Sequence, residues 1–191
     1  MVQTFRTPKF LRNFTRNRSG ASAIEFALLA PLMIGLYLGT VEISEGVAAY
    51  RKVTLTAGAL ANLTSQVTGI SAADKDNILQ ASIAIMEPFQ GGVAAKVSCV
   101  KIDAAGVAKI AWGFATSGVT ARATGENATV PADLRIPGSS LIWSEVSYLY
   151  HPVTGFSPGF SYIAATGKDL SDEMFMSPRI TPPVYDAKSC S

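Results

Sequence analysis

The chain has 191 residues, of which 48% are hydrophobic and 16% charged, and its net charge is +2. That length accommodates one membrane anchor and one modest outer domain. With a single histidine, two distant cysteines and no Gly-rich phosphate loop, nucleophile elbow or HExxH motif, the sequence argues against an enzyme. We expect no catalytic residue, no metal site and no cofactor.

Residues 1–20 form a basic segment that ends at a glycine. Its five basic residues are accompanied by no acid, and they are Arg6, Lys9, Arg12, Arg16 and Arg18. Because Lys and Arg concentrate on the cytoplasmic side of a membrane segment, we expect this leader in the cytoplasm and the rest of the chain outside it. Nucleic-acid binding is the disfavoured interpretation of the same charges, so no nucleic-acid partner is predicted.

Residues 21–41 are predicted to form a transmembrane helix. No residue from Phe26 to Val41 is charged, and about 20 apolar residues are enough to cross a bilayer. Pro31 is expected to kink or loosen this helix. Gly35 and Gly39 would allow another helix to approach closely, although glycines are also simply common in such helices.

Helical spacing continues beyond Val41, which predicts one helix from about Ser22 to about Val67, ended by Gly69. The apolar residues expected to pack this part of the helix on an outer domain are Val41, Val47, Ala48, Leu55, Ala59, Leu60 and Leu63. A capping box from Ser71 to Asp74 then predicts a second helix that runs to about Met86 and is stopped by Pro88.

From Val93 onwards the apolar period becomes two, as in a strand. The predicted strands are Val97–Asp103, Val107–Phe114 and Leu141–Tyr150, with Val100, Ile102, Ile110 and Trp112 on one face of the first hairpin. The proline-punctuated tail, residues 170–191, is predicted to be mostly irregular. Helices followed by strands indicate an α+β, pilin-like fold in which residues 42–191 form the extracytoplasmic domain around a small antiparallel sheet.

The junction between leader and anchor is the strongest functional candidate. Small residues surround Gly20 and Ala21, where we predict that a peptidase cuts. The cut would leave a cationic amine on Ala21, which Glu25 of a neighbouring subunit could neutralise. The alternatives are an ordinary anchor with an acid at its interface, or a secretory signal peptide. The signal peptide is disfavoured because its best cleavage tripeptide, Ala21-Ser22-Ala23, precedes the apolar region instead of following it.

Cys99 and Cys190 are the only two cysteines. Outside the cytoplasm they could form a disulfide that closes a loop of about 90 residues. The alternative is two separate free thiols.

The run RNRSGASAIEFALLAPLMIGLYLGTVEI resembles the amino terminus of the TadE-like pseudopilins, minor components of the bacterial tight-adherence (Tad/Flp) pilus machinery. The matching positions are Gly20, Ala21, Ala23 to Ala27 and Pro31. The stretch from Ile142 to Pro152 resembles the EVxYxYxP strand of the same family, and Pro178-Arg179 resembles another recurring element. The abundant pilin of that system is far shorter than this chain, which argues against the major subunit.

The resemblance implies a minor pseudopilin that takes part in initiating, priming or decorating a pilus and is processed after Gly20. The implied partners are a prepilin peptidase, other pilins and pseudopilins, the inner-membrane assembly platform and the lipid bilayer. The implied location is the bacterial inner membrane, as a single-pass protein with a periplasmic C-terminal domain that can enter the extracellular pilus. The alternative function is a permanently anchored extracytoplasmic binding or scaffold module that does not polymerise.

Overall fold

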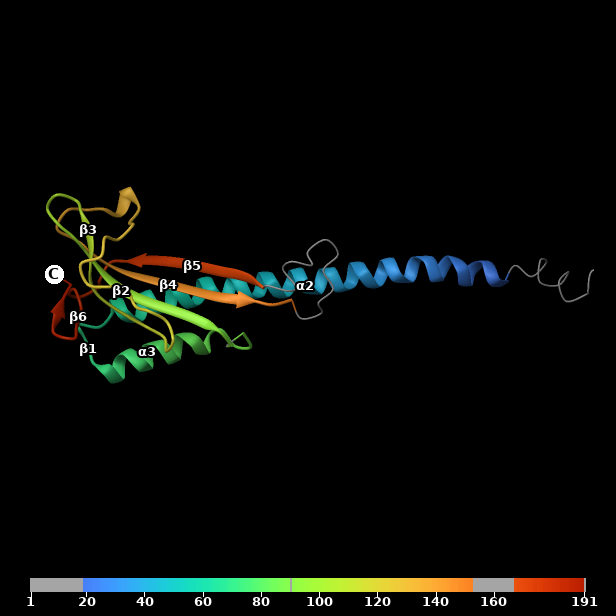
Figure 1. Ribbon diagram of the computed structural model, residues 1–191, viewed down its shortest axis with the longest axis horizontal. Helices are drawn as coiled ribbons and strands as arrows, with labels where there is room; N and C mark the ends of the chain where they lie inside the picture. Colours follow the sequence, from blue (N-terminus) through green and yellow to red (C-terminus); the bar gives the residue numbers. More distant parts are fainter. Residues whose placement is uncertain (1–18, 90, 153–166, 191) are drawn as a thin grey trace, which may run out of the picture.

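The computed structural model describes residues 19–89, 91–152 and 167–190, which form a long helix with an α+β head along its C-terminal half (Figure 1). The helix, α2 (Ser19–Ser65), has 47 residues and continues through Pro31. At about 1.5 Å per residue it is about 70 Å long. The predicted single helix is confirmed, with each end within three residues of the expected position.

Helix α3 (Ala72–Ala84) begins at the predicted capping box. The backbone N–H of Asp74 donates to Ser71 Oγ at 3.2 Å, and the backbone N–H of Ser71 donates to Asp74 Oδ2 at 3.0 Å. This reciprocal pair satisfies two amide groups that the first turn of a helix leaves open. The helix packs beside α2, where Lys52 Nζ donates to the backbone oxygen of Ile85 at 3.0 Å.

The main sheet is antiparallel, with strand order β3-β2-β4-β5. Its strands are β2 (Val93–Ile102), β3 (Ala108–Ala115), β4 (Ser140–Tyr150) and β5 (Lys168–Met176). Figure 1 shows the sheet lying along α2, with α3 on one side. The α+β class and the three predicted strands are confirmed.

The prediction that the tail is mostly irregular is wrong, because β5 pairs with β4 along nine residues. Two short strands follow it, β6 (Val184–Tyr185) and β7 (Lys188–Ser189), and they join β1 (Gly69–Ile70) in a second small sheet. The prolines that suggested irregularity all follow β5. Within β5, Leu170 and Met174 pack against the core while charged residues alternate with them, which is the pattern of an edge strand.

A β-bulge corrects the predicted face of the first hairpin. Cys99 pairs with Trp112 while Val100 pairs with Ile110, so Ala111 has no partner across the ladder. The extra residue places Trp112 on the helix-facing side with Cys99, and it leaves Ile110 on the outer face with Val100. The four residues expected to share a face therefore divide between two cores.

The main core lies between the sheet and α2, and a second core lies under the loop of residues 116–139, which contains the short helix η1 (Ala132–Leu134). Arg122 fastens this loop to the sheet. It donates two hydrogen bonds of 2.8 Å to Glu145 and lies 4.1 Å above the ring of Trp143. The bonds to Glu145 raise the pKa of the Arg122 guanidinium.

The face of α2 that packs on the sheet differs from the predicted one. Of the apolar residues expected there, Leu60 is buried, whereas Val47, Ala48, Leu55 and Leu63 are exposed. The buried face consists of Ala49, Val53, Thr56, Ala57, Leu60, Ala61, Thr64 and Ser65. Most of these are small side chains, which let strand β4 approach so closely that Ser144 Oγ donates to the backbone oxygen of Ala57 at 2.7 Å.

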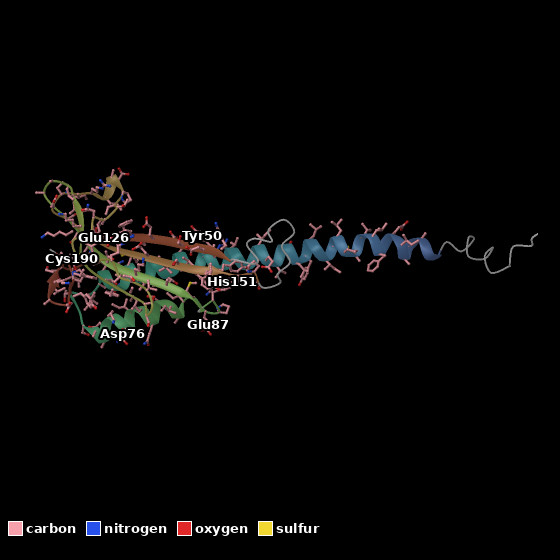
Figure 2. All side chains as sticks on the ribbon, viewed as in Figure 1. Tyr50, Asp76, Glu87, Glu126, His151 and Cys190 are labelled. Atoms are coloured by element: carbon pink, nitrogen blue, oxygen red, sulfur yellow. A yellow bond between two sulfur atoms is a disulfide. The ribbon has the colours of Figure 1, made fainter. Side chains whose placement is uncertain are left out.

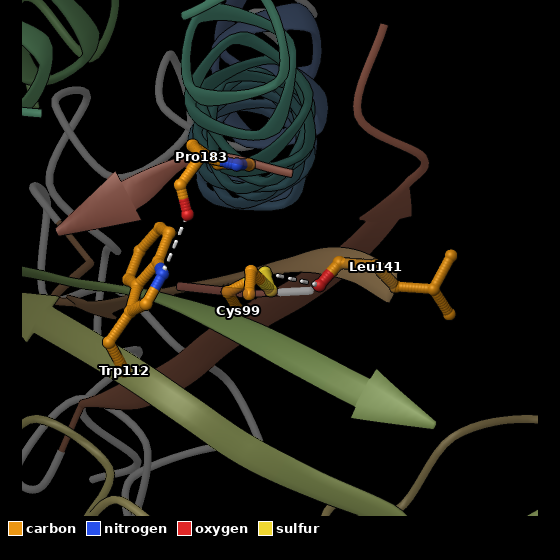
Figure 3. The surroundings of a disulfide bond; sticks show 5 residues. Cys99, Trp112, Leu141 and Pro183 are labelled. Carbon is orange, nitrogen blue, oxygen red and sulfur yellow. Dashed lines mark hydrogen bonds between the residues drawn. A yellow bond between two sulfur atoms is a disulfide. The ribbon is translucent and has the colours of Figure 1, made fainter. Parts of the chain in front are cut away.

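A disulfide joins Cys99 of β2 to Cys190, with 6.0 Å between the Cα atoms and both residues fully buried (Figure 3). Nearby, Trp112 Nε1 donates to the backbone oxygen of Pro183 at 3.0 Å. The backbone N–H of Arg179 donates to the oxygen of Ser65 at 2.9 Å, so the C-terminal segment also contacts the end of α2. The disulfide thus holds the C-terminal segment against both the sheet and the helix.

Candidate functional site on the long helix

The N-terminal half of α2 projects away from the head, with its side chains directed outward on all sides (Figure 2). Nine large apolar side chains between Ile24 and Tyr37 are 55–74% exposed. A soluble surface rarely presents so much contiguous apolar area, and a helix that is apolar all round suits a membrane or a helix bundle. Among the described residues, α2 is the one helix long and apolar enough to cross a membrane.

The head's first hydrogen bond to α2, among the described residues, is at Glu42. The hydroxyl of Tyr150, at the end of β4, lies 3.2 Å from Glu42 Oε2 and 3.3 Å from the Glu42 backbone oxygen. Burial, and then the hydrogen bond to Glu42, raise the pKa of the Tyr150 hydroxyl. One turn further, a Cβ on Gly46 would lie 3.7 Å from the Tyr150 ring. The division into leader 1–20, anchor 21–41 and outer domain 42–191 nevertheless stays a prediction.

Glu25 is the one charged residue between Gly20 and Val41, and its side chain is exposed. The described residues provide it with no ion pair in the isolated chain. A carboxylate in such an apolar segment is expensive unless a cation neutralises it. The structure therefore presents an acid that is unused by its own fold.

The predicted cleavage site, Gly20–Ala21, lies in the first turn of α2, because the helix begins at Ser19. Both residues are exposed, and a Cβ on Gly20 would meet nothing within 4 Å. The first amide groups of a helix lack partners within the helix, so its first turn opens easily. A peptidase could thus draw out this bond without disturbing the head. The roles of Gly20, Ala21 and Glu25 stay predictions.

The sequence did not reveal a polar groove of about 380 Å³ on the outer face of the main sheet. Its charged groups are largely engaged in the fold. Glu145 accepts from Arg122, and Glu173 accepts from Trp143 Nε1 at 2.9 Å. The described residues include no group of three or more His, Cys, Asp or Glu that could hold a metal. The groove therefore offers no evident catalytic arrangement, and the expectation of a non-enzymatic protein stays a prediction.

These features define a class of protein: one exposed N-terminal apolar helix, suited to anchoring in a membrane, carries a small α+β head on its second half. Residues 20–61 match the family model described as TadE-like protein. The match begins at Gly20 and covers almost all of α2, so the resemblance to the TadE-like proteins of the Tad pilus system is confirmed over this helix. No curated protein and no solved structure matches the chain.

Proposed function

We propose that the protein is a minor pseudopilin that takes part in assembling a Tad-type pilus after cleavage between Gly20 and Ala21. One observation carries the proposal. The TadE-like match begins at Gly20, and five residues later an unpaired carboxylate, Glu25, lies on a helix whose apolar side chains are exposed all round.

Processing would create the cation that Glu25 lacks. A free amine on Ala21 has a pKa of about 8 and is mostly protonated at neutral pH. Within one chain this amine lies at the start of the same helix, where the helix dipole favours Glu25 over a cation. In a parallel neighbour it can approach Glu25 directly. Leaving Glu25 unpaired in an apolar bundle would cost several kcal/mol, so subunits in matched register are selected.

The exposed half of α2 would hold each subunit in the bilayer until assembly. Lipid and neighbouring helices are both apolar surroundings, so transfer from one to the other has no large hydrophobic cost. Contacts between helices and the pairing of Glu25 with the Ala21 amine would then favour the packed state. The head remains outside the membrane throughout, since it is built on the other half of the helix.

The second candidate is a permanently anchored binding or scaffold module. It is favoured by the helical conformation of the Gly20–Ala21 bond, which begins one residue earlier at Ser19. A peptidase must unwind that turn before it can cut. If it does not, the amine never forms and Glu25 stays an interfacial acid.

N-terminal sequencing of the full-length gene product, isolated from membranes of cells that contain a prepilin peptidase, separates the two candidates. We expect a product that starts at Ala21. Gly20→Ala should block processing, whereas Gly39→Ala, which adds the same methyl group in open space on the same helix, should leave it intact. A product that starts at Met1 or Val2 in the native cell would exclude the pseudopilin and favour the anchored module.

A further inference from the structure

The apolar surface of α2 does not end where the head begins. Ile43, Val47 and Tyr50 lie in the part of the helix that carries the head, yet they are 70%, 45% and 46% exposed. Their spacing of four and then three residues places them on one face of the helix. They form a stripe that neither the sheet nor α3 covers.

This stripe lies on the same face as Glu25. Position 43 is 18 residues beyond position 25, which is about five complete turns at 3.6 residues per turn. Leu29, Leu32 and Leu36 fall on the same face between them, and all three are exposed. Since α2 is one continuous helix from Ser19 to Ser65, the face that presents Glu25 continues into the stripe.

Lipid cannot cover the whole of this face. From Ile24 to Tyr50 there are 27 residues, or about 40 Å of helix, against a hydrocarbon thickness of about 30 Å. Glu42, Glu45 and Arg51 are interspersed with the stripe, and these charges favour a position outside the hydrocarbon. The stripe is therefore an apolar surface in water unless another protein covers it.

We propose that the stripe of Ile43, Val47 and Tyr50 is the contact surface for helix α2 of a second copy of this chain, displaced outward by about one helical turn. The inference rests on the proposed function, because the pairing of Glu25 with the neighbour's Ala21 amine sets the displacement. It brings position 21 of the neighbour level with position 25, an offset of four residues or about 6 Å.

The same offset gives the stripe a defined partner. Ile43 of the displaced copy lies level with Val47 of the first, and Gly39 of the displaced copy lies level with Ile43 of the first. Gly39 has no Cβ and has open space around it, so it leaves room for the Ile43 side chain. The stripe is thus self-complementary in this register, and a second copy is the occupant that fits it.

Cysteine cross-linking of the full-length chain in peptidase-competent cells tests the register. In Ile43→Cys/Val47→Cys, oxidation should join position 43 of one copy to position 47 of the next and produce a ladder of oligomers. The matched control is Ser44→Cys/Ala48→Cys, which has the same spacing and exposed positions on the adjacent face. The native cysteines are buried and paired with each other. We expect roughly tenfold more oligomer than in the control, because a disulfide requires Cα atoms within about 7 Å.

Each outcome decides the matter. A ladder that contains only this chain and disappears with Gly20→Ala supports the proposal. If the product starts at Ala21 and pili form, but the two double variants cross-link equally or position 43 joins a different protein, the proposal is overturned and the proposed function stands. If the ladder persists with Gly20→Ala, the amine does not set the register and the proposal is overturned as well. A chain that is never processed overturns both.

Discussion

The two halves of α2 use the same secondary structure for opposite purposes. In the N-terminal half, large apolar side chains such as Phe26, Leu28 and Leu36 are exposed. In the C-terminal half, the buried positions are mainly Ala, Thr and Ser, and the sheet provides the large side chains, among them Ile142 and Val146. The first half is thus a surface for lipid or other helices, and the second is a narrow support on which the head is packed.

The difference also explains why one helix can serve both. Small residues at Ala49, Ala57 and Ala61 let the sheet lie against the helix without bending it away from its axis. The N-terminal half makes no demand on the head in return. Changes in either half should therefore have separable effects, on assembly in one case and on the stability of the head in the other.

The largest expected effect is on assembly. Glu25→Leu should abolish pili while membrane insertion is retained, because the leucine adds no charge or volume that a bilayer excludes but cannot bind the amine of a neighbour. Pili are counted by electron microscopy, and insertion is followed by membrane fractionation. Glu45→Leu, in the other half of the helix, is the control and should still form pili. Normal piliation in Glu25→Leu would remove the role assigned to this carboxylate.

Within the head, loss of the disulfide should have the largest effect on stability. Cys99 and Cys190 are 91 positions apart, and a closed loop of that size restricts the unfolded chain enough to stabilise the fold by about 4 kcal/mol. Cys99→Ala/Cys190→Ala should lower the urea midpoint of the full-length chain in detergent. Both tryptophans, Trp112 and Trp143, are buried in the head, so their fluorescence reports its unfolding alone.

The controls for this experiment use the same comparison. Processing at Gly20 should be unchanged in the double alanine variant, since the cut lies at the far end of α2. Non-reducing mass spectrometry of the native chain should find Cys99 and Cys190 joined. If both thiols are alkylated without a reductant, the bridge is absent in the cell and the lost stability must be assigned to packing.

The sequence predicted those parts of the fold that short segments determine. The capping box of Ser71 and Asp74, the stop at Pro88 and the alternation of β4 each depend on residues a few positions apart. It also marked Gly20 and Glu25, whose significance comes from the uncharged residues that follow them. No long-range contact is needed to recognise either.

What the sequence could not predict depends on pairing between distant segments. Trp112 changes face because of one extra residue in the ladder with β2, and β5 is a strand because β4 offers it an edge. On α2, apolar residues recur on more than one face, and only the position of the sheet selects Val53 over Leu55 for burial. The exposed stripe was therefore hidden among residues that resembled a core.

A leucine pair tests the comparison directly. Leu60 is fully buried against the sheet, whereas Leu36 is 65% exposed in the N-terminal half. Leu60→Ala should reduce the free energy of unfolding of the head by about 3 kcal/mol through lost burial and a cavity. Leu36→Ala should change it by less than about 0.5 kcal/mol, as measured by tryptophan fluorescence in urea. Equal losses would mean that the head extends further along α2 than its contacts indicate.

The smallest expected effect lies at the joint between the two halves. Tyr150→Phe removes the hydroxyl that lies 3.2 Å from Glu42 Oε2 and should destabilise the head by about 1 kcal/mol. Tyr148→Phe is the matched control. It lies two residues earlier in β4 and packs on Phe89, and none of the hydrogen bonds of the described residues involves its hydroxyl. A similar loss in both variants would assign the effect to ring packing instead of the bond to Glu42.

The dependence on pH identifies the hydroxyl itself. Burial and the bond to Glu42 raise the pKa of Tyr150 above its value in the unfolded chain. The protonated hydroxyl therefore stabilises the fold fully below the unfolded value of about 10, and this contribution is lost as the pH rises further. Urea midpoints measured between neutral and strongly alkaline pH should fall more steeply for the native chain than for Tyr150→Phe. Parallel pH profiles would show that Tyr150 does not hold the head to α2 through its proton.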